Sequence, residues 1–267
     1  MTNILSVRSR HPAHRDTGSS VRVAMWSGPR NISTAMMRAW ENREDTAVID
    51  EPFYAHYLVE TGVNHPGRDE VIAAQENDDA RVAATLTGPI PDGKAIWYQK
   101  HMTQHMLPDM PLDWLDRVTN CFLIRNPEAV VASFTIQRPD AAAWELGFEQ
   151  QAWLFDHVCD RLGHTPPVID AADVLKDPRK TLSALCAKLG IPFTERMLRW
   201  PVGSRASDGV WAPHWYAAVE RTTGFAPYRD HEAKLTDFQL QLAEQCRPHY
   251  DRLARHRLQI MPAQLSR

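Results

Sequence analysis

Residues 21–40 read VRVAMWSGPRNISTAMMRAW, and this stretch decides the fold. Its first part, Val21 to Trp26, is a run of β-branched and apolar residues typical of a buried strand. The run stops at Ser27-Gly28-Pro29, which has the composition of a tight turn. From Ser33 onward the apolar residues recur at helical spacing. The stretch therefore predicts a strand, a loop and a helix. Backbone N–H groups and the positive end of the helix dipole converge on such a loop, which suits a phosphate.

The same alternation continues along the chain. Short apolar runs predict four more strands, at 47–50, 95–99, 120–124 and 168–170. Helical patterns lie between and after them, at 53–60, 70–86, 126–137, 142–162, 178–189 and 231–258. Short strands alternating with longer helices favour a parallel sheet covered on both faces. We therefore expect an α/β fold: a single three-layer domain with a mostly parallel sheet flanked by helices, as in P-loop NTPases.

Length and composition agree with one domain. The chain has 267 residues, 43% of them hydrophobic and 24% charged, which is ordinary for a soluble globular protein. We assign residues 21–267 to the domain. Residues 1–20 contain Arg8, Arg10 and Arg15 but no apolar stretch of the kind found in secretory signals. They predict a disordered extension or a misassigned start, with an organelle transit peptide as the alternative.

Charge and cysteine content exclude several classes of protein. Thirty basic against 33 acidic residues leave a formal charge of -3, which argues against a strongly basic nucleic-acid-binding protein. The apolar runs are far shorter than the ~18 residues of a spanning helix, so no membrane association is expected. The four cysteines include no CxxC pair, which favours free thiols in a reducing compartment and a cytoplasmic location. No metal-spaced cluster is present, and no metal is predicted.

The first loop carries groups that suit an anion. Arg30 adds a cation, and Ser33 and Thr34 add hydroxyl donors at the helix start. The glycine and lysine of the GxxxxGK[ST] motif are missing. The stretch AVIDE at 47–51 does imitate a Walker-B strand, so an NTPase or kinase remains an alternative. An ordinary strand–loop–helix connection with a serine N-cap is the purely structural alternative.

A second segment has a similar composition. The strand at 120–124 ends in Arg125, and Asn126-Pro127 then opens a helix that carries Ser133. An arginine at a strand's carboxyl end and a serine two turns into the next helix can both face the ligand crevice of an α/β fold. They would offer a bidentate cation and a hydroxyl to a second phosphate group. The structural alternative is a strand exit with an incidental serine.

Together the two segments resemble those of sulfotransferases that use 3′-phosphoadenosine 5′-phosphosulfate (PAPS). RNPEAVVAS at 125–133 is similar to the family's 3′-phosphate segment, and PRNISTA at 29–35 to its 5′-phosphosulfate loop, although Ile32 departs from a glycine-containing pattern. A third, weaker similarity is Asp208-Gly209-Val210-Trp211, which resembles a segment that closes over the nucleotide. The resemblance implies that PAPS is bound by Arg30, Asn31, Ile32, Ser33, Thr34, Arg125 and Ser133.

The resemblance also indicates two candidate bases. Glu51, in Asp50-Glu51-Pro52-Phe53, resembles the catalytic glutamate of carbohydrate sulfotransferases. Because side chains alternate along a strand, we expect only one of Asp50 and Glu51 to face the crevice. The structural alternative is an acid that caps the next helix.

Lys100-His101-Met102 is similar to the lysine–x–histidine segment of cytosolic members, whose histidine is the base. His105 is an alternative candidate for the base. The purely structural alternative is that His101 is an ordinary surface histidine. Either Lys100 or His101 could instead donate to the transferring sulfonate. We expect Arg30, helped by Lys100, to neutralise that group.

The resemblance implies transfer of a sulfuryl group from PAPS to a hydroxyl or amine of a small-molecule acceptor. A nucleotide-binding module that transfers nothing is the alternative from another class. The sequence leaves the acceptor and the oligomeric state open. Several aromatic residues would suit a flat or apolar acceptor or a sugar face, namely Trp97, Tyr98, Trp144, Trp211 and Trp215.

Overall fold

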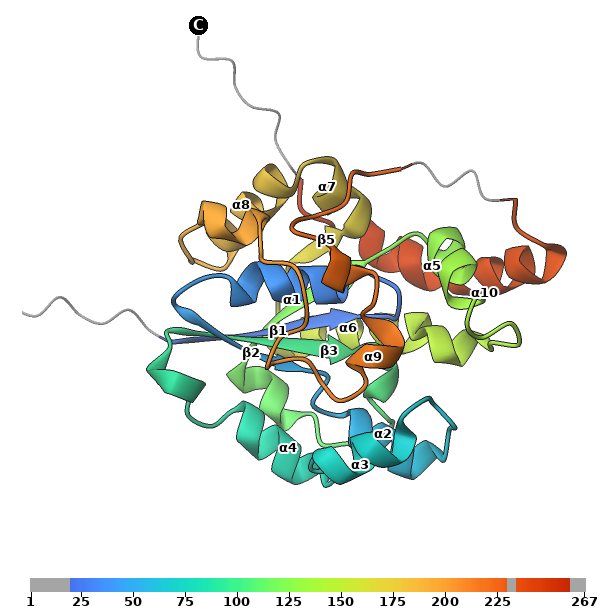
Figure 1. Cartoon of the computed structure of the whole chain (residues 1–267), viewed down its shortest axis with the longest axis horizontal. Coiled ribbons are helices and arrows are strands. Elements are labelled where there is room, and N and C mark those ends of the chain that lie inside the picture. Colours follow the sequence, from blue (N-terminus) through green and yellow to red (C-terminus); the bar gives the residue numbers. More distant parts are fainter. Residues whose placement is uncertain (1–19, 230–233, 260–267) are drawn as a thin grey trace, which may run out of the picture.

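The computed structural model describes residues 20–229 and 234–259 (Figure 1). Its centre is one five-stranded sheet in the order β2-β3-β1-β4-β5, and every strand pair is parallel. The expected α/β fold with a parallel sheet is confirmed. The strands are β1 (Val21–Ser27), β2 (Thr46–Asp50), β3 (Ile96–Met102), β4 (Thr119–Ile124) and β5 (Val168–Asp170).

Helices cover both faces of the sheet, which gives three layers. In Figure 1, α7 and α8 lie at the top of the view and α2, α3 and α4 at the bottom. The α-helices are α1 (Ser33–Glu41), α2 (Tyr54–Thr61), α3 (Arg68–Ala74), α4 (Asp79–Leu86), α5 (Pro127–Phe134), α6 (Phe148–Leu162), α7 (Ala171–Lys176), α8 (Pro178–Lys188), α9 (Ala212–Trp215) and α10 (Asp237–Ala254).

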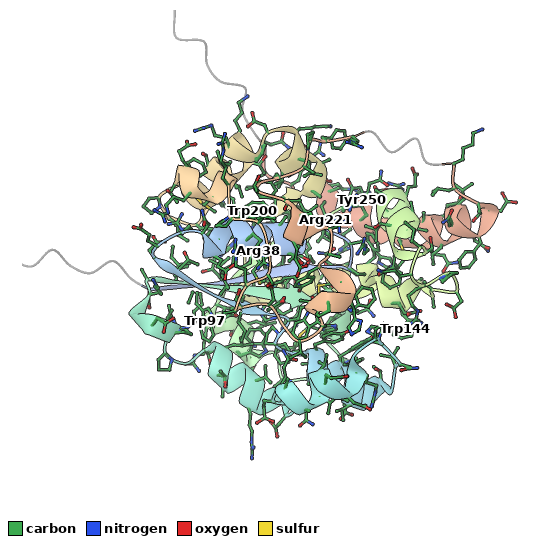
Figure 2. All side chains as sticks on the ribbon, in the orientation of Figure 1. Arg38, Trp97, Trp144, Trp200, Arg221 and Tyr250 are labelled. Atoms are coloured by element: carbon green, nitrogen blue, oxygen red, sulfur yellow. The ribbon has the colours of Figure 1, made fainter. Side chains whose placement is uncertain are left out.

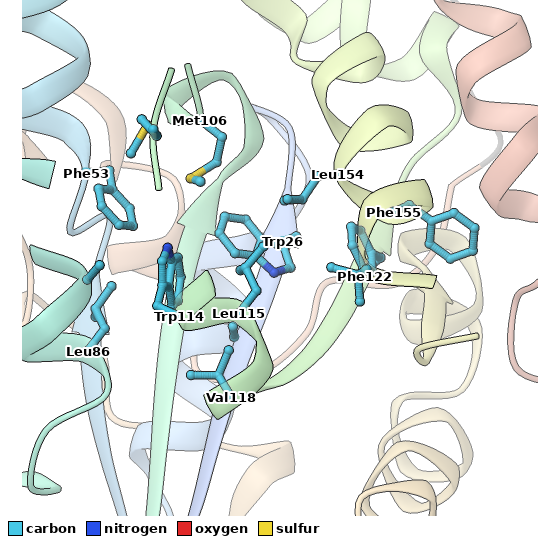
Figure 3. Close-up of a cluster of buried hydrophobic side chains, with 14 of the residues drawn as sticks. Trp26, Phe53, Leu86, Met106, Trp114, Leu115, Val118, Phe122, Leu154 and Phe155 are labelled. Carbon is cyan, nitrogen blue, oxygen red and sulfur yellow. The ribbon is translucent and has the colours of Figure 1, made fainter. Parts of the chain in front are cut away.

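Alternation along the strands produces a separate core on each face. In β1, Ala24 and Trp26 contribute to the cluster that α4 and α6 cover (Figure 3). Val23 and Met25 contribute to the opposite cluster, under α1 and α8. A strand buried on both faces reads as a continuous apolar run. This is why the run at 21–26 predicted its strand well.

Three helix predictions differ from the structure. The predicted helix at 70–86 is two helices, because Asp78 accepts a hydrogen bond from the Arg81 amide and starts α4 anew. The predicted helix at 142–162 is interrupted at Gly147, whose φ of 67° belongs to the left-handed region. Helix α7, which is only six residues long, was not predicted.

The strand order places the ligand crevice. From β1 the chain moves to one side of the sheet, and from β4 it moves to the other, so the loops after these neighbouring strands diverge. Such a switch point is where open α/β sheets bind ligands, at the carboxyl ends of the strands. Helix α9 lies beside the end of β3 in Figure 1.

Two predictions concern parts of the chain that the structure does not describe in full. The predicted extension at 1–20 lies almost wholly outside the described residues, and the predicted helix at 231–258 begins there. Within the described ranges, no helix combines the length and the apolar composition that crossing a membrane requires.

Candidate functional site

A cavity of about 700 Å³ opens at the carboxyl ends of the parallel strands. Pockets of this size typically bind small molecules. Residues 215–229, after β5 and α8 in the chain, form its far wall. Of the predicted site residues, those that line it are Arg30, Asn31, Ile32, Ser33, Thr34, Glu51, Lys100, Arg125 and Ser133, together with the alternative His105.

The first loop has an unusual backbone. Arg30 and Ile32 have φ angles of 56° and 49°, in the left-handed region that β-branched residues rarely adopt. Ile32 is the N-cap of α1, and no side chain caps this helix. The amides of the first turn of α1 are therefore not occupied by a capping side chain, and the first two residues of this turn, Ser33 and Thr34, line the cavity.

Packing from elsewhere holds this loop in place. The Asn31 side chain donates to the carbonyl of Leu123, in β4, over 2.6 Å. A Cβ on Gly28 would lie 2.7 Å from the carbonyl oxygen of Leu146, so only glycine allows this close approach. The strained backbone is thus fixed from two sides before any ligand binds.

Arg30 and Arg125 lie side by side at the ends of β1 and β4. Arg30 Nε donates to Ser133 Oγ over 2.8 Å, and Arg125 donates to the Arg30 carbonyl. Burial lowers the pKa of both guanidinium groups, and the charge of Arg30 lowers that of Arg125 further. Among the described residues no carboxylate forms an ion pair with Arg30. Two half-buried, neighbouring cations make this end of the cavity a site for an anion.

Lys100 is the centre of a second polar cluster. Its side chain is 1% exposed, and its ammonium group donates to Asp50 Oδ1 over 2.8 Å, to Glu51 Oε1 and to Tyr216 Oη over 2.8 Å. These three bonds engage all three of its protons. The Tyr216 hydroxyl in turn donates to Asp50 Oδ2 over 2.6 Å.

The expectation that only one of Asp50 and Glu51 faces the crevice agrees with the cavity lining. Only Glu51 lines the cavity, but both carboxylates reach Lys100. Glu51 has a φ of 42°, which turns the chain at the end of β2 and cancels the alternation of an extended strand. Its amide still donates to the Lys100 carbonyl over 2.9 Å, so the sheet ladder fixes the turn.

The cluster holds two carboxylates and one ammonium. Burial raises the pKa of Glu51, and the charge of Asp50 adds to this, while Lys100 opposes both. Burial alone would lower the pKa of Lys100, but the two carboxylates outweigh it and raise that pKa. Lys100 therefore stays charged, and Glu51, at the cavity surface, is a carboxylate that accepts a proton more readily than usual.

His101 lies on the opposite face of β3, outside the cavity lining. Its ring stacks on Trp26 at 4.2 Å between centroids and is also close to Phe53 and Trp114, in the cluster of Figure 3. Burial, with a smaller effect of Lys100, lowers its pKa to about 3. The geometry therefore does not support His101 as a base in this cavity.

His105 lines the cavity and packs against two tyrosines of α2. Its ring stacks on Tyr54 and Tyr57 at 4.7 and 4.8 Å between centroids. The Tyr54 hydroxyl and His65 Nδ1 form a 2.9 Å hydrogen bond. Of the aromatic residues proposed for an acceptor, only Trp215 lines the cavity. Trp97 and Trp144 lie at opposite ends of the view in Figure 2.

Sequence reasoning missed Tyr216, Tyr54 and His65. The segment around Tyr216 is anchored by contacts that span the chain: Asp208 accepts from Arg38 of α1 over 2.7 Å, and the Gly209 amide donates to Asp50 over 3.3 Å. A Cβ on Gly209 would lie 2.1 Å from the Trp211 ring, so glycine is required there. The sequence signal that could have led to Tyr216 is the segment Asp208-Gly209-Val210-Trp211, because Tyr216 follows Trp211 by five residues.

The fold and site define a class: an α/β protein with a P-loop-like anion site and a buried acid beside it. A sequence model of the sulfotransferase domain matches residues 21–254. The chain belongs to the sulfotransferase family, whose reaction is transfer of a sulfuryl group.

Two curated relatives from Arabidopsis thaliana are named after aminotransferases and not after sulfotransferases. Branched-chain-amino-acid aminotransferase-like proteins 2 and 1 are 35% and 37% identical over 88% of this chain. The chain spans only 41% and 42% of their lengths.

Solved structures with some similarity include a sulfotransferase from Alicyclobacillus acidocaldarius, at 13% identity and a TM-score of 0.49, covering 90% of this chain and 98% of that one. The sulfotransferase domain of the curacin biosynthetic pathway has 16% identity and a TM-score of 0.47, covering 85% of this chain and 97% of that one.

Proposed function

We propose that this protein transfers the sulfuryl group of PAPS to a hydroxyl or amine of a small-molecule acceptor. The observation that carries the proposal is the half-buried pair Arg30 and Arg125 beside the uncapped start of α1, with Glu51 on the same cavity. A doubly phosphorylated nucleotide needs two anion sites, and the carboxylate beyond them suits the acceptor.

In the proposed reaction, the acceptor oxygen or nitrogen attacks sulfur as the bond from sulfur to the phosphate oxygen breaks. The acceptor proton passes to Glu51, and adenosine 3′,5′-bisphosphate leaves. Arg30 and the α1 amides stabilise the negative charge on the sulfonate and the leaving oxygen. Arg125 and Ser133 hold the 3′-phosphate. Lys100 has all three protons engaged, so in this arrangement it positions Glu51 and does not reach the sulfonate.

The hydrogen bonds of Asp50 argue against the alternative of an NTPase. Asp50 stands where a Walker-B acid would hold Mg²⁺. In this structure Lys100 and Tyr216 bond one oxygen each of its carboxylate, and the Gly209 amide adds a third contact. The acid is thereby committed to an internal ion pair, which favours sulfuryl transfer over a magnesium-dependent reaction.

Arg125→Ala tests the donor site. We expect the dissociation constant for adenosine 3′,5′-bisphosphate to rise by the equivalent of about 1.5–3 kcal/mol, because one charged hydrogen-bonding contact is lost. Isothermal titration calorimetry measures it. Arg252→Ala is the matched control, since Arg252 lies on α10 and pairs with Asp156 away from the cavity. An unchanged constant in Arg125→Ala would remove the 3′-phosphate assignment.

Asp50→Asn tests the electrostatics of the base. Transfer requires deprotonated Glu51, so the rate should rise with pH through the pKa of Glu51, above the ordinary range of a glutamate. Asp50 raises that pKa. Its neutralisation should move the acidic limb of the pH–rate profile to lower pH. A limb that stays in place or moves to higher pH would contradict the proposed role of the cluster.

Catalysis and mere nucleotide binding are separated by the product. Protein supplied with PAPS and a metabolite extract should form sulfonated compounds detectable by mass spectrometry. Tight binding of the bisphosphate without any sulfonated product would instead favour the non-catalytic module.

A further inference from the structure

The cavity has a second half, beyond Glu51, whose wall differs from that of the donor half. Its side chains come from α2 and the segment after it, from the end of β3 and the turn after it, and from α9. They are Tyr54, His65, Met102, His105 and Trp215. We call these five residues the aromatic wall.

The aromatic wall carries no charge at neutral pH. Burial, helped by Arg138, lowers the pKa of His65 to about 4. Burial and the nearby His65 lower the pKa of His105 well below its ordinary value. Burial raises the pKa of Tyr54, so its hydroxyl keeps its proton. The adjoining charges of Lys100 and Glu51 pair with each other. The remaining charged residues of the lining belong to the donor half and are Arg30, Arg125, Glu128, Asp170 and Arg229.

The hydrogen-bonding capacity of this half of the cavity is limited to a few atoms. Gln104, which lines it beside the aromatic wall, has a buried Oε1 with no hydrogen-bond partner among the described residues. Tyr54 and His65 satisfy each other. The His105 Nδ1 atom is buried and has no hydrogen-bond partner among the described residues. A sugar would bury several hydroxyls against this surface with few partners, which costs free energy. A flat ring can stack on the aromatic side chains and use a single polar contact.

From this wall we infer that the acceptor is an uncharged aromatic alcohol, a phenol or a benzylic alcohol. The inference rests on the proposed function and names its substrate class. A carboxylate here would lose its hydration without meeting an available cation, since the Lys100 protons are engaged and Arg138, which acts on His65, pairs with Glu145. A protonated amine would lose its hydration against this uncharged wall, and it is not a nucleophile.

A matched pair of ligands tests this. We would titrate 2-naphthol and 6-hydroxy-2-naphthoate into the whole protein at pH 7, with and without saturating adenosine 3′,5′-bisphosphate, by calorimetry. The two differ by one carboxylate. We expect 2-naphthol to bind at least about tenfold more tightly, a difference of about 1.4 kcal/mol. With PAPS in place of the bisphosphate, 2-naphthol should also have the larger kcat/KM.

A second experiment adds a positive charge to the aromatic wall by substituting His65. His65→Lys adds an ammonium group at a half-buried position, and we expect it to reduce or reverse the preference for 2-naphthol. His65→Gln is the neutral matched control and should keep the preference. Unchanged bisphosphate affinity in both variants would show that the donor half is intact.

Equal or tighter binding of the carboxylate by the bisphosphate-bound wild-type protein would overturn the inference, and so would failure of 2-naphthol to bind. Either result leaves sulfuryl transfer standing if the bisphosphate binds. Failure of the bisphosphate to bind would instead overturn the proposed function, and the titrations without it would still report on the aromatic wall.

Discussion

Glu51→Gln is expected to lower the single-turnover rate of sulfuryl transfer by about 10²–10⁴-fold, the usual contribution of a general base. Glutamine keeps the size of the side chain and a hydrogen-bond acceptor for Lys100, but it cannot take the acceptor proton. The affinity for adenosine 3′,5′-bisphosphate should change little, because Glu51 lies beyond the two arginines. The rate is measured by rapid quench with PAPS bound, using the hydroxyl acceptor that the wild-type protein converts fastest.

Two further variants make this result specific. Glu60→Gln changes an exposed acid on α2, outside the cavity lining, and should transfer at the wild-type rate. His101→Phe keeps an aromatic ring against Trp26 and tests the other base suggested by the resemblance. If Glu51→Gln turned over normally while His101→Phe lost its activity, the base would be His101 and our reading of the cavity would be wrong.

Lys100→Met is expected to lower the free energy of unfolding by about 3–5 kcal/mol, as when one partner of a buried ion pair is removed. Methionine fills much of the space, but it leaves Asp50 and Glu51 together without their cation, with Asp50 only 4% exposed. Urea denaturation followed by circular dichroism gives the difference. Lys188→Met removes an exposed lysine of α8 and should have little effect.

The cause of that loss can be separated from simple misfitting of the new side chain. In the triple variant Lys100→Met, Asp50→Asn and Glu51→Gln, no unpaired carboxylate remains in the cluster. Much of the lost stability should therefore return. If the triple variant were as unstable as Lys100→Met alone, packing and not charge would account for the loss.

Local patterns predicted much of the fold. The buried strands are apolar on both faces, so their positions are visible without knowledge of their partners, and the two arginines follow such strands directly. Breaks inside helices were harder to predict. A left-handed backbone turn at Gly147 and a side-chain cap at Asp78 separate the helices there, and apolar periodicity reports neither.

The amino-acid sequence by itself determined the parallel α/β fold and the placing of Arg30, Arg125 and Glu51 at strand ends. These features depend on period and neighbouring residues, which are local. Only the tertiary structure decided how Lys100 is used. Its partner Tyr216 lies 116 positions away, and the left-handed turn at Glu51 brings a second acid to it. The adjacent residues Lys100 and His101 of β3 lie on opposite faces of the sheet. Lys100 lines the cavity, and His101 packs in the aromatic core. Contacts between segments that are distant in the sequence determine what each face packs against, and a local sequence pattern does not reveal these contacts.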